Sequence, residues 1–205
     1  MKSLAIVVLS LSMCCLAQNA DQSSASSKGK KAGGSSDAQF AMKAAQGNMA
    51  EVALGKLATQ NAKSDDVKKF GQKMVDDHSK AEQDLEGVAS KDNLTLPKAV
   101  NAQQKAEEQR LSKLNGPAFD RAYMRLMVQD HTKDVAEFRK ESNSTAANSD
   151  LRDFAKRTYP TLEEHLTMAK SIKDAMGSNA KAKGTKSSAR TKSAAGTSTS
   201  GVSLI

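Results

Sequence analysis

Apolar residues recur at helical spacing through the middle of the chain. In four stretches, about 37–62, 65–90, 117–142 and 150–176, they return every three or four positions, with polar residues between them. This period predicts four amphipathic helices that turn one face to a common core, and no stretch alternates as a strand would. A shorter helix is predicted at about 98–114, where Gln, Glu, Lys and Ala dominate.

Residues at the ends of these stretches predict where the helices begin and end. Ser36 followed by Gln39 has the pattern of a capping box, and Ser64 is the expected N-cap of the second helix. Gly177 is expected to terminate the last helix. Pro160 lies inside that helix and should kink it, so that the helix divides into two segments in line.

The lengths of the connections predict the topology. The first two long helices and the last two are joined by short loops, so each pair should form an antiparallel hairpin. The connection between the hairpins is long and contains the short helix, which at 1.5 Å per residue returns the chain along the bundle. We therefore predict an all-α, ferritin-like four-helix bundle with one long crossover.

Low-complexity segments flank this domain. Residues 18–36 and 177–205 are rich in Ser, Gly, Ala, Lys and Thr, and we expect them to be disordered around a folded domain at 37–176. The formal net charge of +8 comes from these segments and from Lys2 near the N-terminus, because acids and bases balance within the domain. We expect no specific nucleic-acid binding by the domain, but weak contact between the basic tail and an anionic envelope surface.

The first 17 residues have the pattern of a signal peptide. Lys2 precedes an apolar run that is too short to span a bilayer, and cleavage is expected after Ala17, with Ala20 as the second choice. A membrane anchor and lipidation at Cys14 are the alternatives. Cys14 and Cys15 both lie in this segment, so a cleaved protein has no disulfide and no thiolate ligand. The predicted location is the periplasm or outer envelope.

Three histidines and one glutamate fall on the predicted inward faces of the four helices. Glu51 lies on the first helix, His78 on the second, His131 on the third and His165 on the fourth. Their distances from the hairpin turns place them at similar heights in the bundle. Imidazole and carboxylate groups that point at a bundle axis are the ligand types of metal sites in bundles, although the usual Glu-x-x-His pairs are absent.

The four residues have two readings. In the first, each histidine donates to a carboxylate or carbonyl on the next helix and specifies one packing of the bundle. In the second, the four residues bind a divalent metal, and binding is lost below about pH 6 because imidazole must be neutral to coordinate. The chain has no nucleophile elbow and no phosphate-binding glycine loop, so an enzyme is the less favoured class.

Three segments of the domain resemble a known family. They are residues 37–81, with the run EVALGKLA at Glu51, residues 119–141, and residues 151–170, with the run TYPTLEEH at 158–165. In this combination they resemble a family of secreted bacterial proteins known as domain-of-unknown-function family 4142, described as ferritin-like or as predicted outer-membrane proteins. The resemblance implies an envelope location and a ferritin-like bundle, and it implies no established activity.

We therefore expect an exported helical-bundle protein of the periplasm or envelope, non-enzymatic, with a binding or structural role and no cofactor. The alternative is a ferritin-like protein that binds a divalent metal through Glu51, His78, His131 and His165. The sequence does not specify a ligand, a partner or an oligomeric state.

Overall fold

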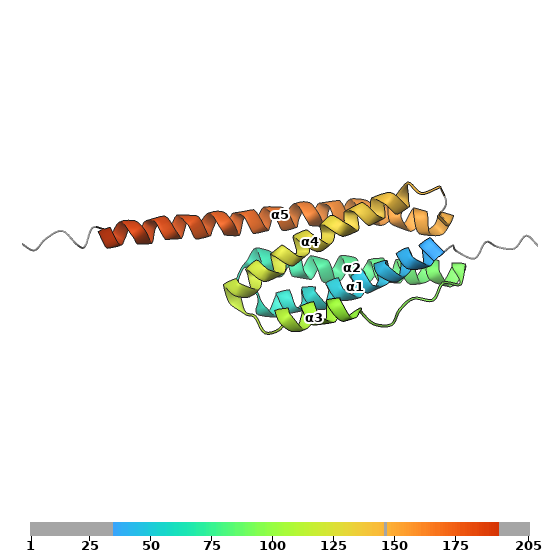
Figure 1. The fold of residues 1–205 in the computed structure, drawn as a ribbon, viewed down its shortest axis with the longest axis horizontal. Coiled ribbons are helices and arrows are strands. Elements are labelled where there is room, and N and C mark those ends of the chain that lie inside the picture. The colour runs from blue at the N-terminus through green and yellow to red at the C-terminus, as the bar shows by residue number, and fades with distance from the viewer. Residues whose placement is uncertain (1–34, 146, 193–205) are drawn as a thin grey trace, which may run out of the picture. The chain divides into compact units, whose positions relative to one another are not determined.

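Five α-helices make up the regular structure of the part of the chain described by the computed structural model, residues 35–145 and 147–192. In order, they are α1 (Ser35–Asn61), α2 (Asp65–Asp92), α3 (Ala102–Leu111), α4 (Gly116–Ser142) and α5 (Ser149–Lys192), as labelled in Figure 1. The all-α prediction is confirmed, and the four long helices begin within two residues of the predicted positions.

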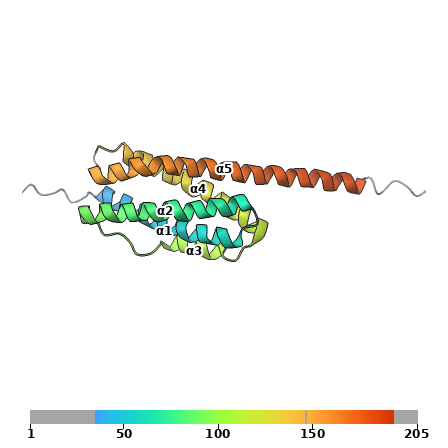
Figure 2. The same ribbon diagram turned by 180° about the vertical axis from the view of Figure 1, so that it is seen from behind.

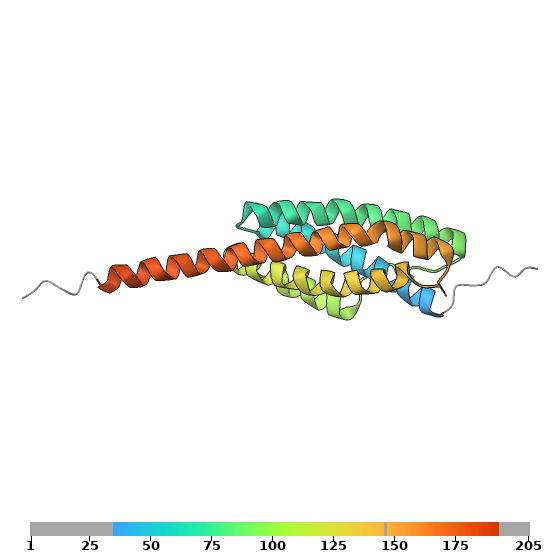
Figure 3. The same ribbon diagram turned by 90° about the horizontal axis from the view of Figure 1, so that it is seen from above.

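The long helices form two antiparallel hairpins. Helices α1 and α2 pack together, as do α4 and α5, and contacts of α2 with α5 and of α1 with α4 close the bundle (Figure 3). The crossover from α2 to α4 contains α3, which packs against α1 and touches α4 (Figures 1 and 2). This is the predicted ferritin-like four-helix bundle with a single long crossover.

The last helix differs from its prediction in two ways. Pro160 lies inside a single continuous helix, so the prediction that it divides the helix in two is wrong. Both sides of Pro160 bury apolar residues in the bundle, Leu151 before it and Leu162 after it, and this packing holds the helix together. The helix also continues through Gly177 to Lys192, beyond its predicted end at 176.

The capping box predicted at Ser36 is replaced by other contacts. Helix α1 begins at Ser35, so Ser36 lies in its first turn, and the neighbouring Asp37 accepts a hydrogen bond from the backbone N–H of Asn148 at 3.0 Å. A capping box is found instead at Asn101 of α3. Ser64 is the N-cap residue of α2, as predicted, although its side chain makes no capping hydrogen bond.

The buried apolar residues form two clusters, one towards each end of the bundle. One cluster includes Phe70, Met74, Phe119, Tyr123 and Met127, and the other includes Phe40, Leu85, Phe138, Phe154 and Leu162. Between the clusters, each long helix carries buried polar residues. This polar layer consists of Asn48 and Glu51 on α1, His78 on α2, His131 on α4 and His165 on α5.

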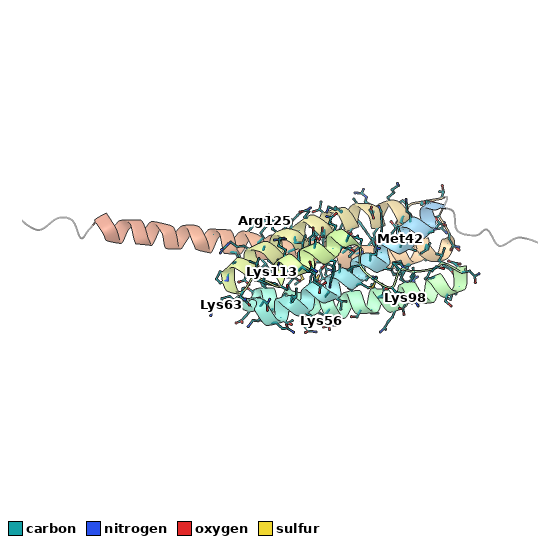
Figure 4. All side chains as sticks on the ribbon, turned by 60° about the horizontal axis from the view of Figure 1, so that its bottom comes forward. Met42, Lys56, Lys63, Lys98, Lys113 and Arg125 are labelled. Carbon is teal, nitrogen blue, oxygen red and sulfur yellow. The ribbon has the colours of Figure 1, made fainter. Side chains whose placement is uncertain are left out.

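Charged side chains cover the outside of the helices. Lys56 on α1 and Arg125 on α4 are among the exposed residues labelled in Figure 4, and Lys98 extends from the crossover. None of the helices in the described ranges combines the length and the apolar character that crossing a membrane requires. The predicted signal peptide at 1–17, the linker up to residue 34 and the tail from 193 lie outside the described residues.

Candidate metal centre

The three histidines of the polar layer meet at the bundle axis. Their ring centroids are separated by 5.7 Å for His78 and His131, 5.4 Å for His78 and His165, and 5.2 Å for His131 and His165. One ring nitrogen from each histidine lies within 4.8 Å of the other two. His78 is 4% exposed and the other two are fully buried. The sequence prediction that the three imidazoles share one level of the bundle is therefore confirmed.

The second ring nitrogen of each histidine has a hydrogen-bond partner. His78 Nδ1 lies 3.0 Å from Asn48 Oδ1, and His131 Nδ1 lies 3.0 Å from the carbonyl oxygen of Met127. His165 Nε2 lies 2.7 Å from the carboxylate of Asp77. A carbonyl or carboxylate oxygen only accepts, so His131 and His165 must donate from these nitrogens.

The orientation of Asn48 fixes the tautomer of His78. The amide nitrogen of Asn48 donates to Glu82 at 3.0 Å, which leaves the amide oxygen to accept from His78 Nδ1–H. All three imidazoles are thus held with one N–H directed away from the centre. The inward nitrogens, His78 Nε2, His131 Nε2 and His165 Nδ1, have no hydrogen-bond partner.

Burial keeps the imidazoles neutral. Desolvation, with the neighbouring histidines, holds the pKa of His78 well below its usual value and lowers the pKa of His131 to about 4. Desolvation also lowers the pKa of His165, although the hydrogen bond to Asp77 opposes this shift. At neutral pH the centre therefore presents three imidazole lone pairs, in the tautomers that metal coordination requires.

The spacing of the inward nitrogens fits a metal ion after a small movement. If all three pairs stood at the 4.8 Å limit, each nitrogen would lie about 2.8 Å from the centre of their triangle. Zn–N bonds are about 2.0–2.1 Å long, so each imidazole would move inward by less than about 1 Å.

Glu51, the fourth residue of the predicted site, is not part of this group. Its carboxylate is buried at 3% exposure, but the cluster of potential ligand atoms contains the three histidines alone among the described residues. Glu51 Oε2 has no hydrogen-bond partner, and neither does the buried hydroxyl of Tyr123, whose pKa is raised mainly by burial and further by Glu51. The structure thus joins three of the four predicted residues and places Glu51 in a separate acidic environment.

Two residues of the centre were missed by sequence reasoning. Asn48 is buried on the first helix one turn before Glu51, where the sequence analysis placed no site residue. Asp77 directly precedes His78 in the sequence, and its carboxylate reaches His165 on the other hairpin. Partial burial alone would raise the pKa of Asp77, but hydrogen bonds from His165 and Lys73 outweigh this effect and lower it.

Comparisons with known proteins place the fold and leave the activity open. The family model described as a domain of unknown function, DUF4142, matches residues 20–172. Among solved structures, the chain is similar to a DUF305 fragment from Deinococcus radiodurans, with a TM-score of 0.59 and 14% sequence identity over 71% of this chain and 97% of that one. At this identity the similarity concerns the fold alone. The search of curated proteins found no match.

Proposed function

Since the chain belongs to the DUF4142 family, which is defined as a domain of unknown function, we propose from the geometry of its centre that it binds a transition-metal ion. The ligands are His78, His131 and His165. The observation that carries the proposal is the convergence of three buried, unprotonated ring nitrogens without any hydrogen-bond partner. Buried polar atoms are nearly always paired, and three facing lone pairs repel one another unless a cation lies between them.

The hydrogen bond of His131 argues against a role limited to packing specificity. A histidine that fixes the register of a bundle must pair with a different helix, as His165 does with Asp77. His131 instead pairs with the carbonyl of Met127, one turn earlier on its own helix. This bond orients the imidazole and contributes nothing to the register of α4 against its neighbours, which is the behaviour expected of an oriented metal ligand.

The donor set favours borderline transition metals. Neutral imidazole nitrogens suit Zn²⁺, copper and Fe²⁺, whereas Mg²⁺ and Ca²⁺ prefer oxygen ligands. A small cavity of about 30 Å³ borders His78, with room for one water molecule.

A metal at this position would connect the two hairpins. His78 belongs to the α1–α2 hairpin, and His131 and His165 belong to the α4–α5 hairpin. The folded state would bind the ion far better than the unfolded chain, so binding would stabilise the bundle. The signal-peptide pattern of residues 1–17 supports export, and we propose that the protein acts as a non-enzymatic metal-binding protein of the envelope.

Two experiments test the proposal. The first is metal analysis of protein purified without chelator, and the second is thermal unfolding of chelator-stripped protein with added Zn²⁺, Cu²⁺ or Fe²⁺. At a hundredfold excess over Kd, the metal should stabilise the wild type by about 2.7 kcal/mol. His131→Leu should lose most of this gain. Co²⁺ should give a visible spectrum of nitrogen coordination in the wild type and not in the variant.

The control is Tyr123→Phe, which removes another unpartnered buried polar atom without changing an imidazole. This variant should retain the full metal-dependent gain. Protein that carries no metal when isolated, and whose unfolding none of the three ions alters, would rule out the proposal and leave the histidines as packing residues.

A further inference from the structure

An acidic pocket lies beside the centre, between α1, α3 and α4. It is a cavity of about 320 Å³ that opens to solvent. Five carboxylates line it, contributed by α1, by the crossover helix α3 and by α4: Glu51, Glu107, Asp130, Asp134 and Glu137. The crossover thus closes one side of a pocket that the four long helices alone would leave as an open groove.

The cationic side chains of this pocket do not balance its acids. Lys43 pairs with Glu137 at 2.6 Å, and Lys133 pairs with Asp130 at 3.2 Å. No ion pair in the described part of the chain includes the other three lining carboxylates, which are Glu51, Glu107 and Asp134. The pocket therefore holds more carboxyl groups than cationic side chains in a partly enclosed space, where ionised carboxylates repel one another more strongly than in open water.

Glu51 is the observation that points to a ligand. Its side chain lines the pocket, yet it is 3% exposed and its Oε2 has no hydrogen-bond partner. Burial, followed by Asp134, Asp130 and Glu107, raises the pKa of this carboxyl well above its usual value. Without a cation the carboxyl avoids the cost of a buried unpaired charge by holding its proton, and a bound cation would favour the ionised form.

We infer that this pocket is a second cation site, which binds a hard divalent ion of the Mg²⁺ type through Glu51 and Asp134 and through waters of the ion. Carboxylate oxygens are the ligands that such ions prefer. The carboxylates are more widely spaced than the three histidine nitrogens, because no three of them fall within 4.8 Å of one another. Mg²⁺ suits this spacing, since it keeps several waters and commonly uses only one or two carboxylates.

The proposed ligands of this site differ from the three histidines, so the experiment separates the two sites. MgCl₂ is titrated by calorimetry into the wild type, Glu51→Gln, Asp134→Asn and His131→Leu, all stripped of metal. The unfolding temperature is then compared in MgCl₂ and in KCl of equal ionic strength, which corrects for screening. The wild type and His131→Leu should bind Mg²⁺ with the same Kd. Glu51→Gln and Asp134→Asn should bind at least tenfold more weakly.

Asp84→Asn is the matched control, because Asp84 is an exposed acid of α2 outside the pocket. This variant should bind Mg²⁺ as the wild type does. Wild-type protein that shows no binding up to about 10 mM Mg²⁺ would overturn the inference. Even the weak calcium sites of extracellular proteins have Kd values of only about 0.1–1 mM. Unchanged affinity in Glu51→Gln would overturn it as well. Neither result would bear on transition-metal binding by the histidines.

Discussion

At the scale of single residues, the chemistry of the centre depends on what holds the outer nitrogen of each imidazole. His165 is the clearest case, because Asp77 accepts from its Nε2 at 2.7 Å and leaves Nδ1 as the inward lone pair. A carboxylate in this position fixes the ring orientation and makes the coordinating nitrogen more basic. Lys73, at 3.1 Å from Asp77, keeps that carboxylate ionised.

Asp77→Asn should therefore weaken metal binding without abolishing it. The amide is neutral and can present its NH₂ group, so it orients His165 less well, and we expect the affinity for Zn²⁺ to fall by about 10- to 100-fold. Competition titration with a chromophoric chelator measures the change. Asp76→Asn is the control, since Asp76 is exposed one position earlier on the same helix. Equal Zn²⁺ affinity in Asp77→Asn and the wild type would contradict this role for Asp77.

At the scale of helices, close approach of α1 to α2 positions the ligand shell. A Cβ built on Gly55 would lie 2.5 Å from the carbonyl oxygen of Gly71, and one built on Gly71 would lie 2.6 Å from the Cβ of Ala58. Only glycine at these positions allows the two backbones to come so near. The contact is two helical turns from the pair of Asn48 and His78, so it brings α1 and α2 close together on the approach to that hydrogen bond.

Gly71→Ala should force the two helices apart. We expect the free energy of unfolding to fall by about 1–3 kcal/mol, because the added methyl group meets buried atoms of α1 that have little room to move. Gly87→Ala is the matched control on the same helix. A Cβ there meets nothing within 4 Å, and the higher helix propensity of alanine should stabilise the protein by up to about 1 kcal/mol. Urea unfolding measures both, and equal effects of the two substitutions would show that the close approach is unimportant.

At the scale of the whole molecule, stability should respond to pH through two opposing sets of buried groups. The histidines, whose pKa values are lowered, disfavour folding as the pH falls below about 6.5, because the unfolded chain then binds more protons. The buried acids act in the opposite direction. Burial, followed by Asp130 and Glu137, raises the pKa of Asp134 from 3.8 to about 7 against the effect of Lys133, so the folded state gains stability as the pH falls from about 7 to 4.

Asp134→Asn isolates the second set. The variant lacks the carboxyl, whereas the wild type carries an unfavourable charge above about pH 7, so the variant should be more stable at pH 8. The pKa shift of Asp134 limits this gain in the free energy of unfolding to about 4 kcal/mol. Because the side chain is partly exposed, we expect a gain of about 1–3 kcal/mol. The gain should disappear near pH 4, where both proteins are neutral at this position. Urea unfolding of metal-free protein at the two pH values tests this, and the histidine contribution cancels in the difference.

The sequence by itself determined the helices, their hairpin topology and the presence of the three histidines at one level of the bundle. These features follow from the spacing of apolar residues three or four positions apart and from the fixed rise per residue of a helix. Both are local properties of the chain. Pro160 shows the limit of local rules, because packing on both sides of it overrode the expected break.

Only the tertiary structure decided which nitrogen of each histidine is free. It also decided that Asn48 and Asp77 bind the outer nitrogens of His78 and His165, and that Glu51 faces an acidic pocket rather than the imidazoles. Successive residues of a helix point about 100° apart, so a helical period assigns a residue to a face without placing its atoms. A hydrogen bond requires its atoms to lie within a few tenths of an ångström of the right distance, and here those atoms come from different helices. The rotation and spacing of the packed helices supply that precision, and they depend on side-chain packing throughout the bundle.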